Sequence, residues 1–144
     1  MKKIAQLVLG LGLAFAGTSH LGVNRNEFRA QVPTVFKDHA NFVVLASGVV
    51  EILLGLGLVV AWKYRVQLGW AVALFFVAVF WGNISQYING VDAFGLNSDR
   101  ARATRLLFQP LLVIWALWST GAWRTFVARK NNHRKYCHAD LRRD

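Results

Sequence analysis

The sequence has few charged side chains and almost no cysteine. Asp, Glu, Lys and Arg make up 17% of its 144 residues, against roughly 25% in ordinary soluble domains. The single cysteine, Cys137, excludes an intrachain disulfide, a CxxC pair and a zinc site built from several cysteines. The chain also lacks a GxxxxGKS/T loop and a GxGxxG motif after a strand. These absences argue against thiol redox chemistry and nucleotide binding.

Long apolar blocks take the place of these features. The chain is 55% hydrophobic with a mean hydropathy of +0.34. Four blocks carry almost no charge, and Glu51 is the one ionised group among them: residues 4–24, 40–62, 66–91 and 106–123. Each is long enough to cross the ~30 Å hydrocarbon core of a bilayer as a helix. The apolar blocks therefore favour lipid as their solvent.

We predict an all-α integral membrane protein, an antiparallel bundle of four transmembrane helices joined by short connections. The expected helices cover about residues 4–23, 41–62, 66–89 and 106–126. One transmembrane domain, residues 1–128, would then be followed by a basic cytoplasmic tail, residues 129–144.

Positive charge is distributed unevenly around these blocks. The net charge is +10, which in a membrane protein favours contact with anionic lipid headgroups over nucleic acid. Eleven Lys and Arg fall in the two termini and the second connection, against six in the first and third connections. Because cytoplasmic flanks carry the excess of Lys and Arg, both termini are predicted to be cytoplasmic.

The first block also has features of a secretory signal peptide. Lys2 and Lys3 precede an apolar run, and Ala14, Phe15 and Ala16 form a triplet of the kind that signal peptidase cleaves. The apolar character continues to Val23, and three further blocks follow. We therefore predict that the segment is retained as the first transmembrane helix, with cleavage as the alternative.

Glu51 lies in the middle of the second block, where an ionisable group is costly. Ser47 and Gly55 lie one helical turn to either side of it on the same face, and Gly48 is one position round. Small residues let a neighbouring helix approach closely, so this face is predicted to point into the bundle. Ser47, Gly48 and Gly55 are the expected helix-packing residues.

Several other polar side chains fall in the same half of the bundle once the predicted topology is applied. Together they predict a ligand pocket that opens to the non-cytoplasmic side, formed by His20, Glu51, Asn83, Gln86, Arg105 and Gln109. Each has a structural alternative: the acid and amides as hydrogen bonds between helices, the histidine as a helix cap, and the arginine as a group that snorkels to the interface. No metal centre is expected, although His133, Cys137 and His138 could approach one another if the tail were helical.

A set of short motifs resembles the DoxX-like family of small four-helix bacterial membrane proteins, in its uncharacterised branch. The motifs, between about residues 14 and 118, are Gly17-Thr18-Ser19-His20, Phe28 with Val32-Pro33, Ser47-Gly48-Val49-Val50-Glu51 with Gly55-Leu56-Gly57, Val77-Ala78-Val79-Phe80 leading to Asn83, and Arg105 with Gln109. The resemblance implies a bacterial inner-membrane protein associated with a membrane oxidoreductase, including quinone-linked systems. It also singles out His20, Glu51, Asn83 and Gln109.

Three hypotheses for function follow. The first is an accessory protein without independent catalytic activity, which binds a small lipophile such as a quinone or holds a partner subunit of a redox or envelope-stress system. Glu51 would be the protonatable group, adjusted by His20, while Asn83 and Gln109 position a carbonyl or hydroxyl. The alternatives are a proton-coupled transporter with Glu51 as a relay, and a scaffold in which Glu51 fixes helix register. Faces rich in glycine also allow a homo-oligomer.

Overall fold

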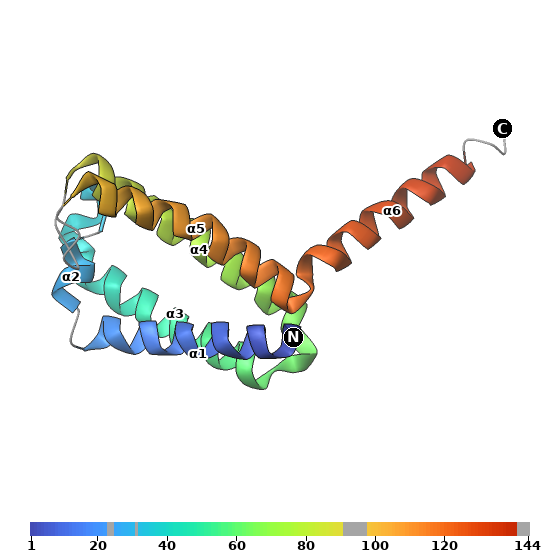
Figure 1. Ribbon diagram of the computed structural model, residues 1–144, viewed down its shortest axis with the longest axis horizontal. Coiled ribbons are helices and arrows are strands. Elements are labelled where there is room, and N and C mark those ends of the chain that lie inside the picture. The colour runs from blue at the N-terminus through green and yellow to red at the C-terminus, as the bar shows by residue number, and fades with distance from the viewer. Residues whose placement is uncertain (23–24, 31, 91–97, 141–144) are drawn as a thin grey trace.

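The computed structural model describes residues 1–22, 25–30, 32–90 and 98–140 (Figure 1). Within these ranges all regular structure is helical, which confirms the all-α prediction. The α-helices are α1 (Lys2–Leu21), α2 (Arg25–Ala30), α3 (Ala40–Val60), α4 (Arg65–Ile88), α5 (Asp99–Thr120) and α6 (Ala122–Asp140), with two short 3₁₀ helices, η1 (Thr34–His39) and η2 (Trp62–Tyr64). The first three predicted helices, residues 4–23, 41–62 and 66–89, overlap α1, α3 and α4, with ends that differ by one or two residues.

The helices α1 and α3 lie side by side in the lower half of Figure 1, because glycines face each other at two levels. A Cβ added at Gly55 would lie 2.5 Å from the Gly10 carbonyl oxygen, and one added at Gly17 would lie 2.6 Å from the Gly48 carbonyl oxygen. Only glycine allows backbones to approach this closely. Residue numbers rise along α1 as they fall along α3, so the two helices are antiparallel.

The helices α4 and α5 form the second pair, in the upper half of Figure 1. Gln109 Nε2 of α5 donates a hydrogen bond to the Phe76 carbonyl oxygen of α4 (3.3 Å). Near the other end of the pair, Thr120 lies against Gly69, so these helices are also antiparallel. The buried apolar core draws on both pairs: Leu9, Leu13, Leu58, Val72, Ala73, Phe76 and Ala116.

The outer surface of these helices is strongly apolar. Leu53 of α3 is 64% exposed and Leu74 of α4 is 66% exposed, the opposite of what water favours for a row of leucines. Among the described residues, three helical stretches are long and apolar enough to cross a membrane: Lys2–Leu21, Val35–Val60 and Trp62–Ile88. A fourth stretch qualifies only as a bent pair, Ala103–Thr120 with Ala122–Asn131.

The prediction of one straight fourth helix over residues 106–126 is wrong, because two helices, α5 and α6, meet within this range. The helix α5 ends at Thr120, and α6 leaves it at an angle of 71°. Gly121 between them has a φ of +76°, the left-handed conformation that commonly ends a helix at glycine. Beyond the bend, α6 continues through the expected tail to Asp140 and projects away from the other helices (Figure 1). The side chains of residues 132–140, including His133, Cys137 and His138, lie outside the described residues.

The variant Gly55→Ala is expected to lower the free energy of unfolding by ~1–3 kcal/mol, since overpacking of a tight contact has this cost. Its new methyl group would meet the Gly10 carbonyl oxygen and the Ala14 backbone nitrogen, which belong to the backbone and cannot rotate away. Gly12→Ala is the matched control, because nothing lies within 4 Å of a Cβ at Gly12. Unfolding in mixed detergent micelles, followed by circular dichroism, compares the two. Equal stabilities would contradict the close helix contact.

Candidate functional site

A cavity of about 450 Å³ lies between α1, α3, α4 and α5. Much of its wall is apolar, with Leu9, Leu13, Phe76, Leu112 and Trp115 among the lining residues. Its polar lining consists of His20, Glu51, Arg105 and Gln109. On α1 and α5 the polar residues lie toward the α2 end of the molecule, and the apolar residues lie deeper. The cavity is therefore amphipathic along its length.

Glu51 is the buried acid of this cavity, with 6% of its surface exposed. Its Oε2 atom lies 3.5 Å from His20 Nε2. Within the part of the chain that the structure describes, this oxygen has no hydrogen bond of good geometry. A buried carboxyl oxygen in this position is costly unless a proton or a ligand satisfies it.

The second ring nitrogen of His20 has a well-defined partner. His20 Nδ1 lies 3.1 Å from Ser47 Oγ, and the Ser47 hydroxyl donates its own proton to the Val44 carbonyl oxygen (2.9 Å). Since that proton is already used, Ser47 Oγ accepts from the Nδ1–H of His20. The lone pair of His20 Nε2 is then directed toward Glu51 Oε2, and the 3.5 Å between these two atoms is longer than a hydrogen bond of good geometry. His20 and Glu51 thus place an imidazole nitrogen and a carboxyl oxygen, both able to accept a proton, beside the cavity.

Two residues of α5 complete the polar lining. Gln109 uses its Nε2 to donate to the Phe76 carbonyl oxygen (3.3 Å), which directs its amide toward α4. Arg105, one turn earlier on α5, brings a permanent positive charge to the cavity. The cavity therefore combines a carboxyl group and an imidazole with an amide and a cation.

Phe28 lines the site, although the sequence analysis names it only in a family motif and not among the pocket residues. It lies on α2, and its ring centroid is 3.5 Å from that of His20, with the two planes tilted by 47°. It lines the main cavity and also a second one of about 260 Å³. Phe28 is the one large apolar residue of the short helix RNEFRA. A single aromatic in an otherwise polar helix was the feature of the sequence that could have indicated its packing against the site.

The six predicted pocket residues do not all share one cavity. Asn83 is buried and lines the second cavity, together with His20, Phe28 and Ser47. Gln86 is buried but is not among the residues that line either cavity. Phe76 and Val79 line the main cavity on α4, and Gln86 lies seven residues beyond Val79, which is ~10 Å of helix rise. The common pocket therefore contains His20, Glu51, Arg105 and Gln109, without the two α4 amides.

The three predicted packing residues support this site. A Cβ added at Gly48 would lie 2.8 Å from the Cβ of His20, so glycine lets α1 approach until His20 reaches Ser47. Gly55 keeps α1 and α3 in contact two turns further along. The small face around Glu51 positions the histidine beside it.

The fold and the cavity define a helical protein with a strongly apolar exterior and an amphipathic cavity between four of its described helices. Residues 9–120 match the model of a family described as a domain of unknown function (DUF8561), and the chain belongs to that family. No curated protein matches the chain. No solved structure matches it either.

The resemblance to the DoxX-like family is therefore wrong, because the family whose model matches most of the chain is a different one. The motifs behind the resemblance are glycine and small polar residues within apolar helices. Helix packing in lipid selects such residues in many unrelated proteins, so their order carries little information on ancestry. The link to oxidoreductase complexes depended on that resemblance and has no support.

The variant Ser47→Ala is expected to remove the preference of His20 for the form with a proton on Nδ1, because its acceptor is lost. Nitrogen-15 NMR of histidine-labelled protein measures this, and His20→Ala assigns the resonance among the four histidines. Ser19→Ala is the matched control, since the Ser19 hydroxyl donates to the Phe15 carbonyl oxygen and not to His20. An unchanged His20 spectrum in Ser47→Ala would contradict the hydrogen-bond assignment.

Proposed function

We propose that this chain is a multi-pass membrane protein that binds a small lipophilic molecule in its main cavity. In this proposal α1, α3, α4 and the bent α5–α6 pair form an antiparallel bundle of four membrane-spanning units. The exposed leucines of α3 and α4 support it, as do the three helical stretches of sufficient length. Lipid is the solvent that such a surface favours.

In the proposed orientation, both termini of the chain lie on the cytoplasmic side of a bacterial inner membrane. The distribution of positive charge supports this orientation. Lys2, Arg65 and Arg124 line a cavity at the end of the helices opposite His20, and the amino terminus lies beside the α5–α6 junction (Figure 1). Clusters of Lys and Arg favour the cytoplasmic face. The main cavity would then lie toward the outer face.

The observation that carries the proposed binding function is Glu51 Oε2, buried without a hydrogen-bond partner in the described residues and lining a 450 Å³ cavity. This volume lies within the ~300–1,000 Å³ of small-molecule pockets. A ligand with a carbonyl or hydroxyl head would take a hydrogen bond from the Glu51–His20 pair, and its apolar body would pack against Leu112 and Trp115. A quinone has this chemistry, and the polar groups of the cavity suit other lipophiles of the same shape.

Binding is favoured over proton-coupled transport because an apolar layer lies below the cavity. Leu58, Val72 and Ala116 are completely buried between Glu51 and the cationic end. Among the described core residues, this layer offers no carboxylate or imidazole to pass a proton onward. Glu51 is therefore proposed to bind a ligand and not to act as a transmembrane relay.

The variant Glu51→Gln is expected to lose the bound molecule while keeping its helical content, because an amide, unlike a carboxyl group, cannot give up a proton to the ligand or take one from it. Native mass spectrometry of protein extracted gently from its own membrane measures the bound molecule. Asp38→Asn is the matched control, since it removes the same charge at an exposed position of η1. The control is expected to retain as much ligand as the natural sequence.

Three results would overturn the proposal. A ligand retained in full by Glu51→Gln would exclude the acid from binding. A co-purified protein with no small molecule would favour the scaffold, in which Glu51→Leu lowers stability and Glu51→Gln does not. Proton flux in liposomes that Glu51→Gln abolishes would favour the transporter.

A further inference from the structure

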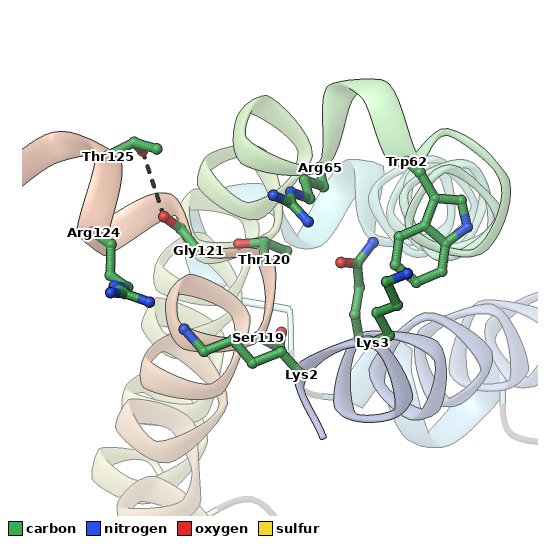
Figure 2. A pocket seen from close by; sticks show the side chains of 10 residues that line it. Lys2, Lys3, Trp62, Arg65, Ser119, Thr120, Gly121, Arg124 and Thr125 are labelled. Atoms are coloured by element: carbon green, nitrogen blue, oxygen red, sulfur yellow. Dashed lines mark hydrogen bonds between the residues drawn. The ribbon is translucent and has the colours of Figure 1, made fainter.

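A third cavity, polar and of about 280 Å³, lies at the end of the molecule opposite His20. Four cationic side chains line it: Lys2, Lys3, Arg65 and Arg124. Figure 2 shows how they come from three helices, the two lysines from the start of α1, Arg65 from the start of α4 and Arg124 from α6. None of the described residues that line this cavity is acidic. Four like charges therefore line one cavity without a carboxylate among its described lining residues, an arrangement that a bound anion would stabilise.

The remaining walls of this cationic cavity include three hydroxyl side chains and three helix amino termini (Figure 2). The hydroxyls of Ser119, Thr120 and Thr125 already donate their protons to backbone carbonyl oxygens, so the cations and the helix amino termini are the groups that would hold an anion. The first turns of α1, α4 and α6 all border it. Helix amino termini carry partial positive charge and free N–H groups, which add to the attraction for a phosphate.

The positive-inside tendency explains why cations occur at this end but not why they surround a cavity. Lys63 and Arg129 are nearby in sequence and exposed, yet neither lines it. Lys63 Nζ instead lies 5.9 Å from the ring centroid of Tyr64. Only some of the cationic side chains at this end of the molecule therefore line the cavity.

An apolar cavity of about 300 Å³ adjoins the cationic one. Its apolar lining is Ile114, Leu117, Trp118 and Trp123, and it shares Lys2 and Arg124 with the cationic cavity. Lys2 Nζ lies 5.8 Å from the centroid of the Trp118 ring, which joins the two cavities. A polar space and an apolar space with a common cationic edge match a molecule with a charged head and a hydrocarbon chain.

We propose that this pair of cavities binds one anionic phospholipid from the adjacent leaflet. Its phosphate lies among the four cations, and an acyl chain lies along Trp118 and Trp123. The inference rests on the membrane insertion proposed above but not on the ligand of the main cavity. Because Lys2 belongs to α1 and Arg124 to α6, the phosphate would link these two helices. It would do so beside the 71° bend between α5 and α6.

Lipid binding by the full-length protein, delipidated in a neutral detergent, tests this inference. Phosphatidylglycerol, diacylglycerol, glycerol phosphate and inorganic phosphate are each titrated, with native mass spectrometry and thermal unfolding as readouts. The pocket variant Lys2→Gln with Arg124→Gln is compared with Lys63→Gln with Arg129→Gln, which also removes one lysine and one arginine from the same side. We expect phosphatidylglycerol to bind about tenfold more weakly to the pocket variant, since each cation near an anionic lipid contributes to affinity, and the control to match the natural sequence.

Each of the other possible results of these titrations would contradict one part of the lipid-binding proposal. Equal weakening in both double variants would show unspecific surface attraction. Inorganic phosphate binding as tightly as phosphatidylglycerol would exclude the acyl chain, and diacylglycerol binding as tightly would exclude the phosphate. Glu51→Gln is expected to bind phosphatidylglycerol normally, so that failure of the main-cavity proposal leaves a separate result.

Discussion

The contact between the glycine faces of α1 and α3 determines the geometry at both ends of the molecule. Toward the α2 end, Gly17 and Gly48 bring the two backbones together, and His20 reaches Ser47 and Glu51 as a result. Toward the other end, the same packing lets Gln6 Nε2 donate to the Leu58 carbonyl oxygen (2.8 Å). A bulkier residue at these glycines would separate the helices and move every side chain that depends on their contact.

The two ends that this contact organises have opposite chemistry. One has a carboxyl and an imidazole that line an amphipathic cavity, and the other has four cations and no acid among the described residues that line it. A buried apolar layer that includes Leu58 and Val72 lies between them. This separation favours two independent binding sites over one continuous path. It also agrees with the electrostatics of a membrane, in which a cationic end contacts anionic headgroups.

Particular residues show where reasoning from the sequence was sufficient and where it failed. Glu51 stood out because an acid in an apolar helix is costly, and that cost depends on its immediate neighbours. Gly121 was overlooked because an apolar block can continue through a residue whose positive φ bends the helix. Phe28 was not recognised as a pocket residue because its place in the site depends on a ring contact with His20, which lies on another helix. The resemblance to a known family failed because motifs of small residues reflect close packing of helices, which many unrelated proteins share.

The sequence by itself determined the helical class, the positions of α1, α3 and α4, and the residues whose burial would be costly. These follow from hydropathy and local helix preference, which act over a few neighbouring residues. Only the tertiary structure decided which polar residues share a cavity: it joined His20 to Glu51, placed Asn83 in a second cavity and left Gln86 in neither. It also assembled the four cations from helices far apart in the chain. Such groupings depend on the rotation and axial register of packed helices, which contacts between distant residues establish.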